Sequence, residues 1–331
     1  MKRTFFFAAL FIVLLFLFFF VGKTSPAKEI TWGVNFSEKQ AERLGLDWKE
    51  TYLALLEDLG AKNLKIAAHW DLLEPRDQQF FFEDLDWQMD RAKEHGAKVL
   101  LAIGMKTPRW PECHIPSFAE TFSKEELRAQ ILEMLSQVVA RYKDHPALEA
   151  WQVENEPLLA FGKCPWRDFS FLQKEMELVQ SLDSGHDVFT SDSGELSLWW
   201  NASRLGDKVA VTLYQKIWSG ELNTYLSLPF PAVSYQRKAW LVEKLFGKKV
   251  IVGELQAEPW VKGELEHSTI AEQEKTMPIS QVQDNISFAR QTGLGTFYLW
   301  GAEWWYWRKT KYEDASFWEE ARNVFSHDEK L

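Results

Sequence analysis

Eight short apolar runs separated by helical stretches are the feature that most restricts the fold of this 331-residue chain. The runs lack a clean two-residue alternation, which is typical of parallel strands that are covered on both faces. Eight strand–helix units in about 300 residues fit one (β/α)8 barrel of the α/β class, the TIM barrel. The predicted strands are 31–36, 63–68, 98–103, 148–153, 187–191, 208–213, 249–253 and 295–300.

Helices are predicted between these strands. Gly60 and Gly96 end the first two, and Ser123 with Glu126 forms a capping pattern at the start of the third. A doubly wound open sheet is the alternative fold. It would be expected to have a glycine-rich phosphate-binding loop after an early strand, and the sequence has none. The predicted helices are 48–59, 85–95, 123–142, 167–182, 196–204, 233–246, 280–292 and 317–325, and 217–220 is expected to lie in a long loop.

The first 28 residues form a separate unit. Lys2 and Arg3 precede an uncharged apolar run, 5–22, whose length is near that needed to span a bilayer. No small-residue cleavage site follows directly, so we predict a signal anchor helix with its N-terminus inside, and cleaved export is the alternative. Residues 29–331 then form an extracytoplasmic barrel domain that is either attached to the membrane through the N-terminal helix or secreted.

Charge restricts the partners of that domain. The formal net charge of the whole chain is −10, and residues 1–28 carry only positive charges, so the barrel domain is more acidic than the chain. An acidic surface argues against nucleic acid and anionic membrane ligands, whereas neutral sugars are compatible with it. The sequence leaves the oligomeric state open.

Cys113 and Cys164 are the two cysteines of the chain. An exported chain with two cysteines suggests one disulfide, which is feasible if the two post-strand segments are neighbours, and two free thiols are the alternative. The sequence has no Cys-x-x-Cys pair and its seven histidines are scattered, which disfavours zinc. We predict no metal and no organic cofactor.

Two glutamates stand at the ends of predicted strands. Glu156 follows strand 148–153 within Asn155-Glu156-Pro157, where the proline stops the strand, and Glu254 follows strand 249–253. Reactive residues of such barrels gather at the C-terminal strand ends. A pair of carboxyl groups there is what acid/base and nucleophilic cleavage of a glycosidic bond requires.

Polar, acidic and aromatic side chains follow the other predicted strands. Aromatic rings stack on the apolar faces of sugars, and carboxylates and amides hydrogen-bond sugar hydroxyls, so we predict a carbohydrate substrate. Trp32, Trp87 and Trp240 are expected in the core or between helices. The residues at the strand ends are Asn35, Lys65, His69, Trp110, Tyr214, Glu258, Trp260, Trp300, Glu303, Trp304 and Trp305.

Asn155-Glu156-Pro157 together with Glu254 resembles the clan A glycoside hydrolases, barrel enzymes with catalytic glutamates on their fourth and seventh strands. The resemblance covers the chain after residue 28. It implies that Glu156 is the acid/base and Glu254 the nucleophile. A separation of about 5–5.5 Å between these carboxyl groups would give the retaining route, and about 6.5–9.5 Å the inverting one.

The same resemblance implies further contacts with the substrate. Asn155 would bond the sugar 2-hydroxyl, Tyr214 would contact the nucleophile, and Trp300 would form the floor of the cleavage subsite. Lys65 and Thr212 stand where family 5 has arginine and histidine, while 107–110 is more similar to families 39 and 42. The family within the group of families 5, 39 and 42 therefore stays open.

Several alternatives remain at this point. Glu154 and Glu258 are rivals of the two catalytic candidates, and we interpret Glu154 as a structural partner and Glu258 as a loop contact. Lys65 is either a substrate-site residue or an ordinary ion-pair partner inside the barrel. We predict an exported glycosidase that cleaves a β-linked oligo- or polysaccharide with retention. A membrane-tethered carbohydrate-binding pseudoenzyme and a glycan-remodelling transglycosylase are the alternatives, and endo or exo action is left open.

Overall fold

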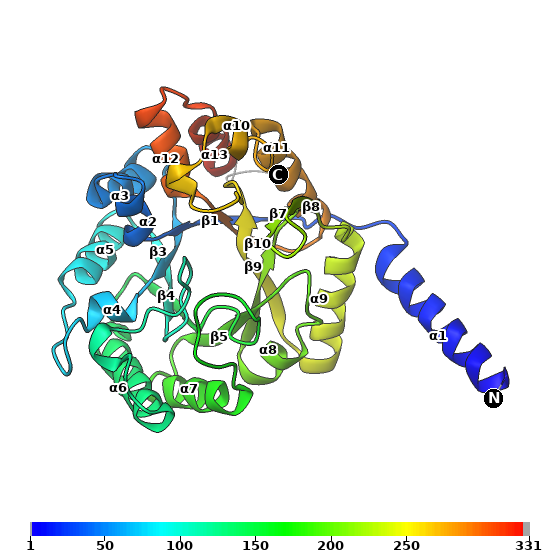
Figure 1. Ribbon diagram of the computed structural model, residues 1–331, viewed down its shortest axis with the longest axis horizontal. Helices are drawn as coiled ribbons and strands as arrows, with labels where there is room; N and C mark the ends of the chain where they lie inside the picture. Colours follow the sequence, from blue (N-terminus) through cyan, green and yellow to red (C-terminus); the bar gives the residue numbers. More distant parts are fainter. Residues whose placement is uncertain (1, 327–331) are drawn as a thin grey trace.

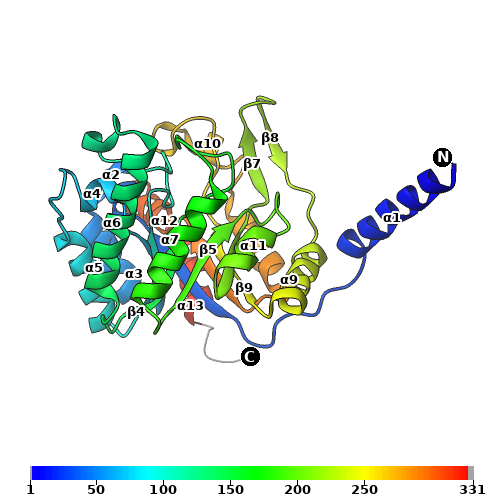
Figure 2. The same cartoon turned by 90° about the horizontal axis from the view of Figure 1, so that it is seen from below.

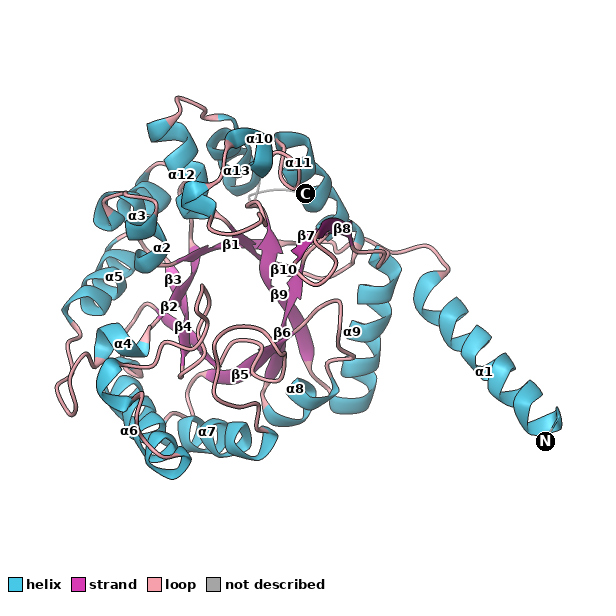
Figure 3. Cartoon of the chain, viewed as in Figure 1, coloured by secondary structure: helices cyan, strands magenta, loops and turns pink. Residues whose placement is uncertain are grey.

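The computed structural model describes residues 2–326 and contains a closed barrel of eight parallel strands, in the order β1-β10-β9-β6-β5-β4-β3-β2, inside a ring of helices (Figures 1 and 3). The predicted (β/α)8 barrel is confirmed. Met1 and residues 327–331, the last five of the predicted domain, lie outside the described residues. The strands are β1 (Thr31–Phe36), β2 (Asn63–Ala67), β3 (Lys98–Ile103), β4 (Leu148–Val153), β5 (Asp187–Asp192), β6 (Lys208–Leu213), β9 (Lys249–Gln256) and β10 (Thr296–Trp300).

Each predicted helix is present. Ser123 and Glu126 form the predicted capping box at the start of α6. The helix expected at 196–204 begins only at Trp200, because Trp199 has a φ of 63°, which an α-helix cannot include. The helices are α3 (Trp48–Glu57), α5 (Glu83–Glu94), α6 (Lys124–Tyr142), α7 (Phe169–Leu182), α8 (Trp200–Leu205), α9 (Ala232–Phe246), α11 (Ile279–Gln291) and α13 (Ser316–Ser326).

The barrel also carries shorter helices and strands that were not predicted. The loop expected at 217–220 is wrong, since β7 (Lys216–Ser219) pairs antiparallel with β8 (Thr224–Ser227), and Trp218 packs on Tyr225 with ring centroids 4.9 Å apart. This hairpin stands out from one end of the barrel (Figure 2). The other additions are α2 (Glu38–Arg43), α4 (Trp70–Leu73), α10 (Ile270–Gln273), α12 (Ala302–Lys311) and 3₁₀ turns at Ser117–Ala119 and Leu265–His267.

Trp304 and Trp305 do not lie in the barrel mouth, where the sequence placed them. Both belong to α12 and are fully buried. The Trp304 indole donates to Gln273 Oε1 at 2.9 Å, and the Trp305 indole donates to the Ala257 carbonyl at 2.7 Å. Because α12 follows β10, both rings point into the protein interior, where they hold α12 in place.

The barrel interior changes from apolar to polar along the strands. Leu100, Ala150, Phe189, Ala210 and Tyr298 form one buried apolar layer inside the barrel. Side chains two residues apart on a strand face the same side. The residues two positions after Ala150, Phe189 and Ala210 are Gln152, Ser191 and Thr212, and all three are buried and polar. On these three strands the inward-facing residues therefore become polar toward the C-terminal strand ends.

Helix α1 (Lys2–Phe20) extends away from the barrel (Figures 1 and 2). Its last turn contacts α9, where Phe18 lies 6.2 Å from Trp240 between ring centroids and Arg237 donates to the Leu17 carbonyl at 3.1 Å. Trp240 is 48% exposed, so of the two expected places it lies between helices, α9 and α1, and not in the core. In contrast to the expected anchor, no helix within residues 2–326 is both long enough and apolar enough to cross a membrane.

Candidate active site

Glu254 lies inside the barrel on β9. The strand was predicted to stop at 253, but it continues to Gln256 because Glu254 pairs with Thr212 of β6 and Gln256 pairs with Trp300 of β10. Glu254 is buried, with only 3% of the residue exposed. Its Oε1 accepts from Lys65 Nζ at 3.2 Å, and its Oε2 accepts from the Tyr214 hydroxyl at 2.9 Å. Both oxygens of Glu254 thus have donors.

Lys65 is the cation of this pair. It is buried on β2, and its ammonium also lies 3.5 Å from the Gly253 carbonyl. The two interpretations of Lys65 therefore coincide, because it is an ion-pair partner inside the barrel and its partner is the predicted nucleophile. Burial, together with the charge of Glu254, raises the pKa of Tyr214, so this phenol stays a donor.

Glu156 lies directly after β4 in a different environment. Its backbone has a φ of 44°, and its N–H donates to Ser191 Oγ at 2.8 Å, which holds the strand end to β5. Thr212 Oγ1 lies 3.4 Å from Glu156 Oε1. Burial raises the pKa of Glu156 well above its ordinary value, and the charges of Glu254 and Glu112 raise it further. This carboxyl group is therefore suited to carry a proton.

Asn155 is held by its oxygen. Asn155 Oδ1 accepts from Gln152 Nε2 at 2.9 Å and from Ser191 Oγ at 3.1 Å. The amide nitrogen is left for other partners, and a hydrogen bond from this side chain lowers the pKa of Glu112 against the opposing effect of burial. The sequence missed Gln152 and Ser191, although both stand near strand ends, the signal that identified the other candidates.

Glu112 is a third carboxyl group of the mouth that the sequence did not reveal. It is buried, and burial and then the charge of Glu254 raise its pKa to about 7. It lies in the loop after β3, which packs closely on the loop after β4. A Cβ on Gly162 would lie 2.5 Å from Glu112 Cβ, and Gly162 has a φ of +90°, so only glycine fits there. No strand-end pattern could have identified such a loop residue.

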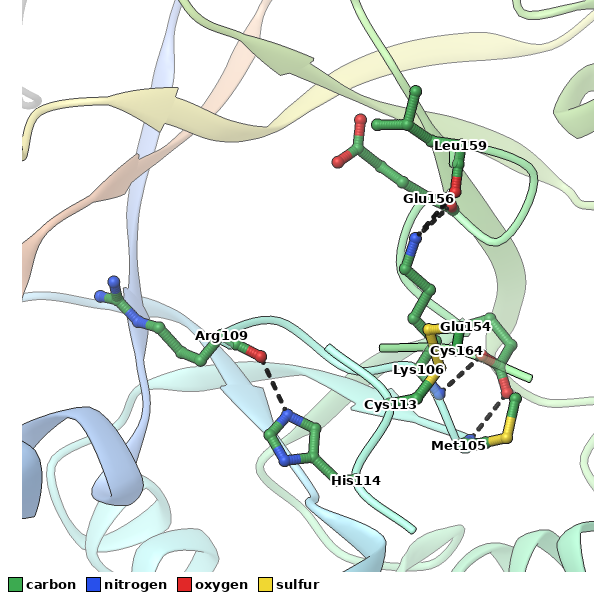
Figure 4. The surroundings of a disulfide bond; sticks show 9 residues. All are labelled: Met105, Lys106, Arg109, Cys113, His114, Glu154, Glu156, Leu159 and Cys164. Carbon is green, nitrogen blue, oxygen red and sulfur yellow. Dashed lines mark hydrogen bonds between the residues drawn. A yellow bond between two sulfur atoms is a disulfide. The ribbon is translucent and has the colours of Figure 1, made fainter. Parts of the chain in front are cut away.

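The predicted disulfide between Cys113 and Cys164 is present and joins the same two loops, with Cα atoms 5.2 Å apart (Figure 4). Beside it, Lys106 Nζ donates to the Glu156 carbonyl at 2.8 Å. The loops after β3 and β4 are thus covalently connected next to the candidate acid.

Glu154 has the structural role that we predicted. Its carboxylate accepts from the Met105 and Lys106 backbone N–H groups, both at 2.7 Å. Figure 4 shows its side chain on the opposite side of the strand end from that of Glu156. A buried neighbour, Glu175, hydrogen-bonds Glu154, and burial raises the pKa values of both carboxyl groups.

Trp300 lies under Arg109, whose guanidinium carbon is 3.9 Å from the ring centroid. The Trp300 indole donates to Glu258 Oε1 at 2.7 Å, and Arg109 donates to Glu258 and, at 2.6 Å, to Glu303 Oε2. Glu258 therefore makes the loop contact that we expected, and this contact is a buried ion pair, because Arg109 reaches it from the loop after β3. One face of Trp300 is covered by Arg109.

Asn35 connects strands at the barrel mouth. Its amide nitrogen donates to the carbonyls of Gly253 at 3.0 Å and Leu299 at 3.2 Å. Within residues 2–326, Asn35 Oδ1 and Arg109 Nε are buried without a hydrogen-bond partner, and both residues line a small pocket with Lys65 and Trp300. An acceptor and a donor are therefore left for a ligand.

The remaining candidates lie at the edge of the site or behind it. Trp110 is exposed at the rim, whereas the His69 and His114 rings are buried against each other, 4.0 Å apart. Burial lowers the pKa values of both histidines, so they are neutral structural residues. In the part of the chain that the structure describes, no group of three or more His, Cys, Asp or Glu side chains is arranged to hold a metal ion.

Comparison with known sequences points to glycosidases. The Glyco_hydro_42 family, described as beta-galactosidase, matches residues 42–237, more than half of the chain. A beta-galactosidase from Arthrobacter sp is 32% identical over 159 residues, which are 41% of this chain and 23% of that protein. Mannan endo-1,4-beta-mannosidase F from Aspergillus clavatus is 26% identical over 118 residues, 33% and 26% of the two chains. The chain spans about a quarter of the length of these relatives.

Solved structures support the fold. A GH5_18 protein from Bifidobacterium longum has a TM-score of 0.60 at 15% identity, with 82% of this chain and 69% of that chain covered. A beta-galactosidase from Rahnella sp. R3 has a TM-score of 0.56 at 12% identity, with 92% and 57% covered. At these identities the likeness shows the barrel architecture alone.

Proposed function

The chain belongs to glycoside hydrolase family 42 and is a glycosidase, and from this premise we propose that it cleaves a β-linked oligo- or polysaccharide with retention, Glu156 being the acid/base and Glu254 the nucleophile. One observation carries the assignment of roles. Glu254 receives hydrogen bonds from Lys65 and Tyr214, whereas the pKa of Glu156 is raised by burial and by the charge of Glu254. One carboxyl group is held as an anion and the other as an acid.

The first step uses both states. Glu156 donates its proton to the leaving oxygen while Glu254 attacks the anomeric carbon, so the glycosidic bond breaks and a glycosyl ester forms on Glu254. The ester carries no charge. The electrostatic contribution of Glu254 to the raised pKa of Glu156 is then absent, so Glu156 stays ionised. In the second step Glu156 accepts a proton from the water that attacks the anomeric carbon, and the ester bond to Glu254 breaks, which releases the sugar and restores the Glu254 carboxylate.

Neighbouring side chains would position the sugar. Asn155 is held through its oxygen, so its amide nitrogen, which also bonds Glu112, would be the donor to a sugar hydroxyl. Asn35 Oδ1 offers an acceptor in the pocket beside Lys65. Trp300 and Arg109, which also line that pocket, form a stacked pair.

A neutral β-galactoside or β-mannoside is the substrate class that we propose. Galactosidases and a mannosidase are among the relatives, and Glu112, Glu156 and Glu254 lie within electrostatic reach of one another, which disfavours anionic sugars. We also propose that the enzyme is exported, because a basic start precedes the apolar N-terminal run and Cys113 forms a disulfide with Cys164.

The test is covalent trapping. An activated β-galactoside or β-mannoside with fluorine beside the anomeric carbon slows the second step, so the glycosyl ester accumulates. Mass spectrometry of peptides is expected to place the sugar on Glu254, and NMR of the hydrolysis of an unmodified aryl glycoside is expected to show the β-anomer first. Labelling of Glu258, or an α-anomer as first product, would contradict the assignment, and binding without turnover would favour a pseudoenzyme.

A further inference from the structure

Four aromatic side chains from four different loops form a continuous row at the barrel mouth, which we call the aromatic row. They are Trp110 after β3, Phe161 after β4, Trp260 after β9 and Tyr214 after β6. Successive ring centroids lie 6.1, 5.6 and 5.5 Å apart, from Trp110 to Phe161, to Trp260 and to Tyr214. Because the Tyr214 hydroxyl donates to Glu254, the row begins at the nucleophile.

The outer end of the row faces solvent. Trp110 is 46% exposed and Phe161 is 37% exposed. Exposed aromatic groups next to a polar site are typical of ligand-binding surfaces. Core packing therefore does not account for these two rings.

The loops that carry the two rings are fixed to each other. The disulfide between Cys113 and Cys164 joins them, and the Lys163 N–H donates to the Pro111 carbonyl at 2.9 Å. Arg43 of α2 donates to the Trp110 carbonyl at 3.3 Å. A rigid pair of rings loses little conformational freedom when a ligand binds, which favours affinity.

The position of Glu156 indicates what the rings bind. Lys106 Nζ donates to the carbonyls of Glu156, at 2.8 Å, and Leu159, at 3.4 Å, so the acid and the loop that carries Phe161 form one unit. A general acid lies on the leaving-group side of the bond because it protonates the leaving oxygen. The exposed rings next to it therefore lie on that side as well.

We propose that Trp110 and Phe161 form the binding surface for the leaving-group sugar, a neutral pyranose whose apolar face stacks on one of the two rings while its edge contacts the other, which is inclined at 64° to the first. This inference rests on the proposed function, because it needs Glu156 to be the acid. It makes the two aromatic residues determinants of substrate length, since a substrate without a leaving-group sugar gains nothing from them.

The experiment compares substrates that differ only in the leaving group. β-Galactosyl fluoride is paired with β-linked galactobiose, and β-mannosyl fluoride with β-linked mannobiose, and the pair that the wild type hydrolyses is used. Trp110→Ala is expected to lower kcat/KM for the disaccharide about tenfold, mainly through KM, which corresponds to about 1.4 kcal/mol. Its kcat/KM for the fluoride, which has no leaving-group sugar, is expected to stay unchanged.

Controls separate this role from a structural one. Phe161→Ala is expected to behave like Trp110→Ala, and Trp110→Phe, which keeps a ring, is expected to restore most of the disaccharide activity. Trp200→Ala removes another exposed tryptophan, which lies on α8 and is 53% exposed, and kcat/KM is expected to stay unchanged for both substrates.

Equal losses on fluoride and disaccharide, or no loss on either, would overturn the inference while the proposed function stands. Wild-type protein that hydrolyses neither pair, or turnover that survives Glu254→Gln, would overturn the proposed function and the inference with it.

Discussion

The two sides of the barrel mouth carry the same residue type in opposite electrostatic environments. On the nucleophile side, Lys65 and Tyr214 donate directly to the carboxylate of Glu254. On the acid side, the ammonium of Lys106 donates to the backbone carbonyl of Glu156. Burial and the charges of Glu254 and Glu112 raise the pKa of the Glu156 carboxyl group, and the charge of Lys106 offsets them only in part.

The comparison shows that the division of labour depends on where the cations are directed. Both sides have one buried lysine and at least one glutamate. A lysine aimed at a carboxylate stabilises the anion, while a lysine aimed at a carbonyl leaves the neighbouring carboxyl group to be neutralised by a proton. Glutamate chemistry alone would not distinguish Glu156 from Glu254.

The largest effect on kcat is expected when each of the two carboxyl groups is removed in turn, which tests whether the two sides differ in role. Glu254→Gln is expected to lower kcat about 10⁴-fold for every substrate, because no nucleophile remains. Glu156→Gln is expected to lose about as much with a sugar leaving group but only about tenfold with dinitrophenolate, which leaves without a proton. Steady-state kinetics with both leaving groups checks this, and equal losses of Glu156→Gln on the two would refute its role as acid.

A smaller loss is expected when the cation of the nucleophile side is removed. Lys65→Met leaves Glu254 without its ammonium partner and is expected to lower kcat about 100-fold, with Lys65→Arg retaining part of the activity. Lys238→Met is the matched control, because Lys238 is also buried but donates to the carbonyls of Gly194 and Ser197. An equal loss in both methionine variants, at equal thermal stability, would show that Lys65 has no special part.

On the acid side, two buried carboxyl groups behind β4 make the free energy of unfolding depend on pH. Burial raises the pKa of Glu154 to about 7 and that of Glu175 well above its ordinary value. The folded state thus holds protons that the unfolded state releases, so this stability is present below the unfolded pKa of about 4.5 and is lost as the pH rises through about 7.

Glu175→Gln, which cannot ionise, is therefore expected to flatten that dependence and to raise the free energy of unfolding at pH 8 by on the order of 1–2 kcal/mol. Denaturant unfolding at pH 5 and pH 8 measures this effect. Parallel pH dependences of wild type and variant would show that the carboxyl pair does not hold the proton.

The smallest expected effect tests whether the charge of Glu112 contributes to the raised pKa of Glu156. Glu112 raises the pKa of Glu156, so Glu112→Gln is expected to move the alkaline limb of the kcat/KM profile about 0.5–1 unit to lower pH, with kcat at the optimum little changed. Glu149→Gln, on an exposed position at the opposite end of β4, is the control. A shift to higher pH, or no shift, would exclude a role for Glu112 in setting that pKa.

Much of the site was predictable because it stands on strands. Glu156, Asn155 and Lys65 were identified at strand ends, and the closed barrel brings them together with Tyr214 and Glu254. Their roles as catalytic and binding residues stay predictions. Glu112, Glu258 and Arg109 could not be placed in the same way, since their contacts depend on how the long loops after β3 and β9 fold across the mouth.

The sequence by itself determined the eight strands of the barrel, because short apolar runs separated by helical stretches are a local pattern. Only the tertiary structure decided which glutamate receives the ammonium of Lys65. The ammonium of Lys65 reaches Glu254 across 189 residues of chain, and burial sets how strongly each charge is felt. Contacts over such separations exist only once the barrel closes, so no local pattern encodes them.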